Sequence, residues 1–376
     1  MRKCKLSECV KEINDRTIEN NQYEVLTSSK SGIFSQEEYF DKQVASKDNT
    51  GYKIIKNGQF TYRSMSDSGT FTINRLEDKE IGIVSPAYPV FEAINIDAEF
   101  LKYYFKSELF NKAIINLSQG STRTALKFKD LIDIEIYLPE IEEQKRIVKI
   151  LKNNDQIIEK YDELIKEKEQ FIKSQFVEMF ERYKNEKKYK LKELSKFVTV
   201  GIANSATQDY TTDGVVMLRN QNIKENYLDD NDLIYINEDF SEKYKNKKLI
   251  ENDILVTRTG YPGIACIVPK KYENCQTFTT LIIRLKDNSD INANYVCHYI
   301  NSIYGKKYVK DNQVGVAQQN FGATALGEMP IFIPSLYEQN VFIQIVQLVD
   351  KQKFNYINKI KLLNEIINIF LGGKKI

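Results

Sequence analysis

Side chains that could recognise nucleic-acid bases are concentrated in a few short polar stretches of this sequence. Arginine carries paired donors that suit guanine, while asparagine and glutamine carry a donor and an acceptor that suit adenine. Such residues follow predicted strands or precede the last predicted strand of a globular part, at Arg63 and Ser64, Arg123, Arg219, Asn220 and Gln221, Arg258 and Thr259, and Gln318, Gln319 and Asn320. Solvated surface loops have a similar composition, so base recognition and an ordinary loop both remain open.

Lysine-rich stretches could add contacts to a phosphate backbone, which position a protein on DNA without specifying sequence. The candidates are Lys30, Lys42, Gln43 and Lys47, together with the lysine-rich run 243–248. A lysine-rich loop is more often simply solvated, and the net charge of the chain is only +2. Any nucleic-acid contact must therefore use local basic patches or be shared with a partner.

Residue patterns for catalysis are missing from this sequence. It contains neither a Gly-x-x-x-x-Gly-Lys-Ser/Thr loop nor a Gly-x-Gly-x-x-Gly motif for nucleotide phosphates. The turn at 85–89 is only superficially similar to the Asn/Asp-Pro-Pro-Tyr loop of amino-methyltransferases, because it lacks the Asn or Asp. The single histidine, His298, lies among apolar residues, which favours a packed position and nearly excludes a catalytic triad. The sequence thus predicts no catalytic or metal site in this chain.

Cysteine usage and hydropathy indicate a reducing, aqueous compartment. The five cysteines form no Cys-x-x-Cys pair, and their odd number argues against a disulfide framework. No run of 18 apolar residues occurs, and the N-terminal segment lacks the apolar core of a secretion signal. We therefore predict a cytoplasmic protein without membrane contact.

A heptad pattern predicts the longest element that could position the polar stretches. Leu151, Ile158, Ile165 and Ile172 recur every seven residues, and a neighbouring line runs through Ile150, Ile157, Leu164 and Phe171. Such a double stripe among Glu and Lys residues is typical of a long helix that packs along another helix. Pro139, followed by glutamates, is a favourable helix start. About 40 residues at 1.5 Å each would make a rod of roughly 60 Å.

The same element returns near the C-terminus, where Val349, Tyr356, Leu363 and Phe370 again recur every seven residues. Pro334, Gln339 and Tyr356 follow Pro139, Gln144 and Tyr161 by 195 positions, and residues 295–302 follow 100–107 by the same interval. A fixed offset that includes both a globular part and a helix indicates a tandem duplication.

The duplication divides the chain into four predicted segments. A first globular domain occupies 1–138 and its long helix 139–186, while a second globular domain occupies 187–333 and its helix 334–376. Each globular part contains strand candidates and one or two helices, which indicates an α/β (α+β) class. Residues 28–51 are polar and are expected to be irregular. The two long helices are expected to pair as an antiparallel coiled coil.

The motifs LPEIEEQKRIVKIL, IPSLYEQNVFIQIV and NDILVTRTGYPGIACIVP resemble the specificity subunit of type I restriction–modification systems. Residues 28–50 are similar to the opening of one class of that family's target recognition domains. The resemblance extends over nearly the whole chain. It implies two target recognition domains that each read half of a bipartite double-stranded DNA site, with the paired helices as a spacer that sets the gap.

The resemblance also implies partners. Modification subunits, expected to number two, would dock on the helices, bind S-adenosylmethionine and methylate adenine. A separate restriction subunit would hydrolyse ATP with Mg²⁺ and cut DNA, and this chain would carry no cofactor. Two alternatives stay open: a related system whose partner fuses methylase and nuclease, and a coiled-coil adaptor whose globular parts bind protein rather than DNA. A self-contained enzyme ranks last.

Overall fold

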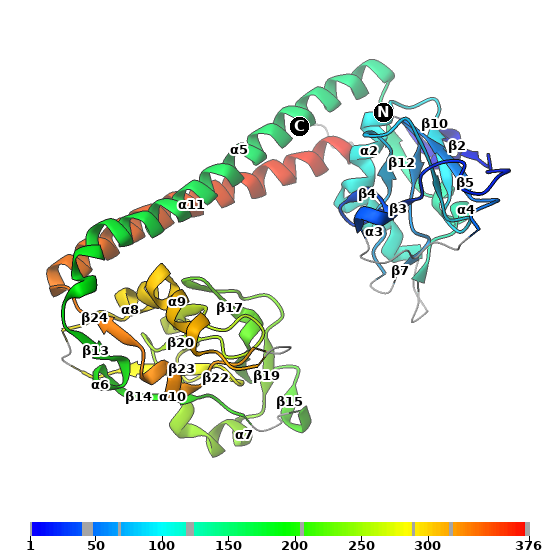
Figure 1. The fold of residues 1–376 in the computed structure, drawn as a ribbon. Helices are drawn as coiled ribbons and strands as arrows, with labels where there is room; N and C mark the ends of the chain where they lie inside the picture. Colours follow the sequence, from blue (N-terminus) through cyan, green and yellow to red (C-terminus); the bar gives the residue numbers. More distant parts are fainter. Residues whose placement is uncertain are drawn as a thin grey trace. The chain divides into compact units, whose positions relative to one another are not determined.

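The computed structural model describes residues 2–39, 48–66, 69–117, 124–203, 207–287, 290–315 and 319–372. The chain forms two compact units, each of which contains parts of both long helices. Unit 1 combines residues 1–163 with 355–376, and unit 2 spans residues 164–354. The two units have the same mixture of short strands, short helices and long-helix segments (Figure 1).

Unit 1 is built from antiparallel strand pairs. A four-stranded sheet has the order β2-β10-β6-β8, and the pairs β1-β12, β3-β4, β5-β9 and β7-β11 surround it. The strands are β1 (Arg2–Lys5), β2 (Val10–Ile13), β3 (Leu26–Ser29), β4 (Gly32–Ser35), β5 (Lys53–Lys56), β6 (Phe60–Thr61), β7 (Met65–Ser66), β8 (Asn74–Arg75), β9 (Ile81–Val84), β10 (Val90–Ala93), β11 (Thr124–Ala125) and β12 (Glu135–Leu138). The short helices are α1 (Gln36–Tyr39), α2 (Ala98–Lys106), α3 (Glu108–Leu117) and α4 (Phe128–Ile132).

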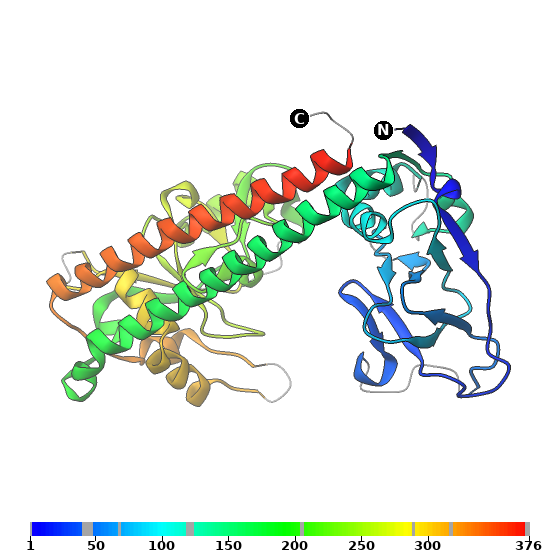
Figure 2. The same ribbon diagram turned by 90° about the horizontal axis from the view of Figure 1, so that it is seen from above.

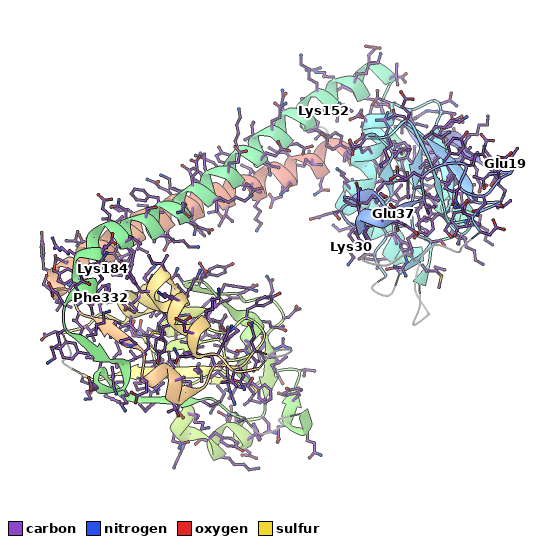
Figure 3. The ribbon with its side chains drawn as sticks, viewed as in Figure 1. Glu19, Lys30, Glu37, Lys152, Lys184 and Phe332 are labelled. Carbon is purple, nitrogen blue, oxygen red and sulfur yellow. The ribbon has the colours of Figure 1, made fainter. Side chains whose placement is uncertain are left out.

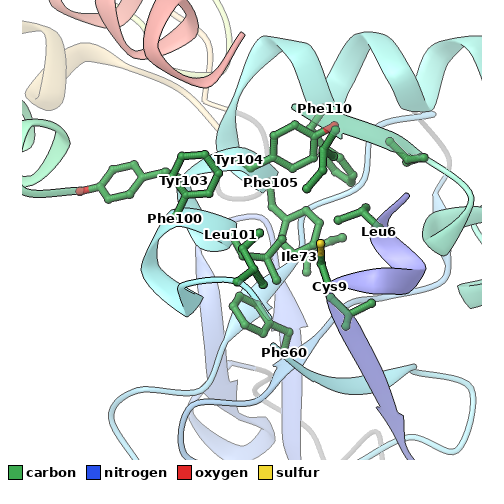
Figure 4. Packing of buried hydrophobic residues seen from close by; sticks show 14 of the residues in the cluster. Leu6, Cys9, Phe60, Ile73, Phe100, Leu101, Tyr103, Tyr104, Phe105 and Phe110 are labelled. Carbon is green, nitrogen blue, oxygen red and sulfur yellow. The ribbon is translucent and has the colours of Figure 1, made fainter. Parts of the chain in front are cut away.

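The core of unit 1 lies between the sheet and helices α2 and α3. Phe60 stacks on Phe91 with ring centroids 5.5 Å apart, and Phe105 meets both rings edge-on. Figure 4 shows Phe60, Leu101 and Phe105 packed near Leu6 and Cys9, so the first residues of the chain close the same core. Asp97 caps α2 by accepting hydrogen bonds from the Glu99 and Phe100 amides, both at 3.0 Å.

Unit 2 repeats this plan with two four-stranded sheets in place of one. Its sheets have the orders β14-β23-β20-β21 and β15-β19-β16-β22, with the pairs β13-β24 and β17-β18. The strands are β13 (Lys188–Lys190), β14 (Ser195–Val200), β15 (Tyr210–Thr211), β16 (Val215–Leu218), β17 (Ile223–Lys224), β18 (Tyr227–Leu228), β19 (Ile234–Ile236), β20 (Ile254–Val256), β21 (Ala265–Ile267), β22 (Gln276–Thr277), β23 (Leu281–Leu285) and β24 (Pro330–Phe332). The short helices are α6 (Leu191–Leu194), α7 (Glu238–Lys243), α8 (Ala293–Asn301), α9 (Ile303–Asn312) and α10 (Ala323–Gly327).

The two long helices are α5 (Ile141–Phe180) and α11 (Leu336–Leu371), and both views show them side by side (Figures 1 and 2). They run antiparallel. In unit 1, Tyr161 stacks on Tyr356 with centroids 5.4 Å apart, and Leu151 shares a core cluster with Leu371. In unit 2, Lys353 pairs with Glu169 at 3.0 Å, and Phe176 meets Phe342 edge-on at 5.3 Å. The tandem α+β plan with paired long helices is therefore confirmed.

The expectation that residues 28–51 are irregular is wrong for residues 28–39, which include strand and helix, whereas residues 48–51 contain neither. Strands β3 and β4 pair in a hairpin whose register joins Leu26 to Ser35 and Ser29 to Gly32, and α1 follows directly. The apolar signal is weak because each strand has only four residues. The side chain that anchors the hairpin is Leu26, which is buried against Ile55 and Val84.

Candidate nucleic-acid interface

Three polar stretches of unit 2 that are far apart in sequence meet at one place. Residues Thr259 and Asn320 form an antiparallel bridge, and the Phe321 amide donates to the Arg258 carbonyl at 2.9 Å. The Arg258 Nε donates to Asn320 Oδ1 at 3.2 Å, and Asn220 Nδ2 donates to Thr259 Oγ1 at 2.9 Å. We call Asn220, Arg258, Thr259 and Asn320 the polar cluster of unit 2. All four side chains are partly exposed, so they are held in place and still reach solvent.

The other predicted DNA-contacting residues near the polar cluster differ in their exposure and in their hydrogen bonds. Arg219 donates to the carbonyl oxygen of Asp232, so its guanidinium is engaged in fixing the segment after β16. Gln221 and Gln319 are exposed. Gln318 lies outside the described residues. The described candidates in this unit thus divide into a connected cluster, two exposed glutamines and one arginine with a structural contact.

A rigid turn beside the polar cluster presents an aromatic residue that sequence reasoning missed. Tyr261 has 85% of its surface exposed, yet its carbonyl accepts a hydrogen bond from Thr257 Oγ1 at 2.7 Å. Gly263 has a φ of +88°, and a Cβ there would lie 2.7 Å from the Val309 side chain. The turn therefore requires glycine and offers little freedom. Exposure of a large apolar ring was the missing signal, because the sequence shows only a Gly-Tyr-Pro-Gly turn.

An ion pair between half-buried Arg284 and buried Asp253 supports the strand that leads to the polar cluster. Arg284 on β23 donates to both carboxylate oxygens of Asp253, at 2.8 and 2.6 Å, and to the Lys248 carbonyl at 2.9 Å. The hydrogen bond to Asp253 raises the pKa of Arg284. Since Asp253 immediately precedes β20, this bidentate contact fixes the strand that ends just before Thr257 and Arg258. The pair thus supports the segment that carries Arg258 and Thr259.

In unit 1 the two equivalent chain segments are joined by the same backbone contact, and we call this contact between segments the joint of each unit. Strand β7 pairs with β11 so that Met65 faces Ala125, and the Leu126 amide donates to the Ser64 carbonyl at 2.9 Å. Ser64 and Leu126 precede Arg258 and Phe321 by 194 and 195 positions, and those two residues make the equivalent contact in unit 2. The Ser64 hydroxyl donates to the Ala87 carbonyl at 3.0 Å, so it holds the loop. Arg123 lies outside the described residues.

A cleft of about 830 Å³ adjoins this joint in unit 1. Arg63, Met65 and Ser66 line one part of it, and Ser29, Lys30 and Gln36 line another. Lys30 and Arg63 are exposed, and Figure 3 labels Lys30 among the side chains of unit 1. The Oε1 atom of Gln36 is buried and accepts no hydrogen bond from the described part of the chain. The cleft thus offers two cations and an amide, which suits DNA, and Gln36 was not identified from the sequence. Lys42, Gln43 and Lys47 lie outside the described residues.

The predicted helix-pairing residues divide by burial. Leu151, Ile172 and Val349 are buried, while Ile158, Ile165, Tyr356, Leu363 and Phe370 are half-buried. The neighbouring heptad line behaves differently, since Ile157 and Phe171 are 40% and 45% exposed. On α11, Leu348, Phe354 and Leu362 are 65%, 63% and 58% exposed. Both helices therefore carry apolar side chains that the described chain leaves uncovered.

Among the described residues, no group of three or more His, Cys, Asp and Glu side chains could hold a metal ion. None of the helices within those residues is both long and apolar enough to cross a membrane.

Comparisons with known proteins agree with these features. The family model described as "Type I restriction modification DNA specificity domain" matches residues 12–170 and 183–368. The chain is 38% identical over 85 residues to the specificity subunit of type I restriction enzyme MjaVIII, and 33% identical over 108 residues to that of MjaIX, both from Methanocaldococcus jannaschii. These segments cover 23% and 28% of this chain, and only 19% and 25% of the relatives.

A solved structure supports the fold across the full length. The match is to one chain of a structure described as "Structural basis underlying complex assembly and conformational transition of the type I R-M system". Its TM-score is 0.61 and its sequence identity to this chain is 14%. The match covers 99% of this chain and 97% of the other. Because the family model matches twice and accounts for most of the sequence, the chain belongs to the family of type I restriction–modification DNA specificity proteins, which recognise DNA targets.

Proposed function

We propose that each unit reads one half of a bipartite double-stranded DNA site, and that the chain acts as the recognition subunit of a DNA adenine methyltransferase and restriction complex. The observation that carries this proposal is the repeated joint, in which Ser64 and Leu126 of unit 1 correspond to Arg258 and Phe321 of unit 2. A duplicated loop joint with polar residues around it suits two readers of the same kind. Arg258, Asn320 and Asn220 carry donors and acceptors that match purine edges in the major groove.

The two readers would differ in how they bind. Unit 1 offers a cleft with Lys30, Arg63 and Gln36, whereas unit 2 offers the polar cluster and the exposed ring of Tyr261. Lysine and arginine contacts to phosphate would position the protein, and the amides would contribute base discrimination. Different contact chemistry in the two units implies two unlike half-sites rather than a palindrome.

The long helices would have two roles in the same proposal. As a rigid antiparallel pair they would set the gap between the half-sites. Their exposed apolar residues, Ile157 and Phe171 on α5 and Leu348, Phe354 and Leu362 on α11, would bind the modification subunits. Those subunits would supply S-adenosylmethionine and adenine methylation, and a restriction subunit would supply ATP, Mg²⁺ and cleavage. This chain would then need no cofactor and perform no catalysis.

The test is to co-express the chain with a candidate methyltransferase subunit and map the methylated adenines in host DNA. A two-part motif with one fixed gap is the expected result. Exchange of residues 187–335 for those of a relative should then change only one half of the motif. A continuous motif, or no methylation by a stable complex, would contradict the two-reader proposal and favour the adaptor that binds protein. A partner with fused methylase and nuclease would be recognised by the identity of the co-purifying chain.

A further inference from the structure

A buried glutamine occupies the first turn of each long helix and makes the same contacts in both units. Gln144 Oε1 accepts a hydrogen bond from the Asp97 amide at 2.8 Å, and its Nε2 donates to the Pro139 carbonyl at 2.8 Å. In unit 2, Gln339 Oε1 accepts from the Asn292 amide at 2.8 Å, and its Nε2 donates to the Pro334 carbonyl at 2.9 Å. The two glutamines are 1% and 0% exposed.

These contacts lie where the chain leaves each globular part. Pro139 follows strand β12 directly and precedes α5, and Pro334 lies between β24 and α11. Asp97 and Asn292 are the residues that cap α2 and α8. Each glutamine amide therefore joins the start of the long helix, the strand-to-helix turn and the start of a domain helix. Gln339 donates also to the Asp290 carbonyl at 3.0 Å, which adds a further contact in unit 2.

Only a side chain with a donor and an acceptor at its end can satisfy both backbone groups. Glutamate would accept from the amide but could not donate to the proline carbonyl, and methionine would satisfy neither. A buried backbone group that loses its hydrogen-bond partner destabilises the fold. Apolar packing next to the glutamines is also repeated, since Ile147 and Val148 join the core of unit 1 and Phe342 and Ile343 join that of unit 2. The packing would keep the helix attached if the amide were lost, while the angle of attachment would be less defined.

We propose that Gln144 and Gln339 are positioning residues that fix the angle between each DNA-reading globular part and the long helix that follows it, and thereby restrict the complex to one gap length. This inference rests on the proposed function, because it concerns how the paired helices set the distance between the two DNA-reading parts. A small change in angle at the start of a rod of about 60 Å moves the far end by several ångströms, which is comparable with one base-pair step of about 3.4 Å.

The experiment compares the wild-type complex with the variants Gln144→Met and Gln339→Met, each co-expressed with the methyltransferase subunit. Methylated adenines are mapped on a plasmid library in which the two half-sites are separated by the native gap or by one base pair more or less. Each variant should keep both half-site sequences, while the preference for the native gap falls roughly tenfold. Gln347→Met is the matched control, because Gln347 is exposed on α11 and its replacement should leave the gap preference unchanged.

The outcomes separate this inference from the proposed function. Lower methylation at every gap with an unchanged preference would show that the glutamines are merely structural and would overturn the inference. If one methionine variant fails to assemble, the other variant tests the same prediction at its own glutamine. A wild-type complex that recognises no two-part site would instead overturn the proposed function itself.

Discussion

Tyr161 on α5 stacks on Tyr356 on α11, its equivalent in the second repeat, with ring centroids 5.4 Å apart and planes inclined by 24°. Residues separated by one repeat length normally occupy matching places in different copies. In an antiparallel pair of duplicated helices, equivalent residues contact each other only at the midpoint of the pair. Tyr161 and Tyr356 therefore mark that midpoint. The ammonium of Lys359 lies 5.4 Å from the Tyr161 ring centroid and extends the stack.

This midpoint is the place to test whether helix length sets the gap. Insertion of one heptad after both Tyr161 and Tyr356 preserves the apolar faces and lengthens the pair by about 10 Å, or roughly three base pairs. We expect methylation at a motif with unchanged half-sites and a gap about three base pairs longer. Insertion in α5 alone should shift its contacts with α11 and abolish methylation. An unchanged gap after the paired insertion would contradict the spacer role.

Arg258 should contribute base discrimination in one half-site. Its Nε is held by Asn320, which leaves the guanidinium oriented and partly exposed. Arg258→Ala should weaken discrimination at one position of the unit 2 half-site by about 1–3 kcal/mol, without effect on the other half-site. Competition binding of the methyltransferase complex to single-base variants of the site measures this. Lys307→Ala, which removes an exposed cation on α9, is the control. A uniform loss over all sequences would assign Arg258 to phosphate instead.

The architecture could be predicted because the heptad spacing of apolar residues and the internal duplication are both visible in the sequence itself. The heptad spacing of Leu151 and Ile172 predicted a helical contact face, and the interval of 195 positions related each long helix to its copy. The same pattern could not show which line of residues the second helix covers. Ile157 and Phe171 repeat as regularly as their buried neighbours but remain 40% and 45% exposed.

The candidate site was predictable by residue type but not by arrangement. Asn220, Arg258 and Asn320 were named from composition, whereas their meeting depends on a bridge between segments about 60 positions apart. Tyr261 and Gln36 were missed because exposure and an unpartnered buried oxygen are properties of the fold. The hairpin of β3 and β4 was missed because four-residue strands with few apolar residues give almost no alternation.

The exposed apolar residues of α11 should be required for assembly. Leu362 and Phe354 are 58% and 63% exposed, and replacement of an exposed apolar residue usually changes stability by less than about 0.5 kcal/mol. We expect Phe354→Ser and Leu362→Ser to leave the thermal unfolding midpoint of the chain almost unchanged but to weaken binding of the modification subunit at least about tenfold. Isothermal titration of the purified subunits measures the affinity. Lys361→Ser, on the same helix, is the control, and equal affinity for all variants would contradict docking at this surface.

His298 should make the stability of unit 2 depend on pH, and as the only histidine it can be tested without interference from another. Burial, and to a smaller extent the nearby Lys353, lowers its pKa from 6.5 to about 4. Between these values the unfolded chain binds a proton that the folded chain does not, so stability is complete above pH 6.5 and falls as the pH drops toward 4. The loss should reach roughly 2 kcal/mol by pH 5.

The variant His298→Phe keeps a flat ring against Phe342, which the imidazole meets edge-on at 5.2 Å, and cannot take up a proton. Its urea midpoint, followed by far-ultraviolet circular dichroism, should therefore vary much less between pH 7 and 5 than that of the wild type. Tyr103 occupies the equivalent position in unit 1, where its hydroxyl donates to Asp155 at 2.6 Å. Tyr103→Phe is consequently the matched control: it removes a hydrogen bond but should keep the wild-type pH dependence. If the urea midpoint of His298→Phe fell with pH as steeply as that of the wild type, a group other than His298 would be responsible for the pH dependence.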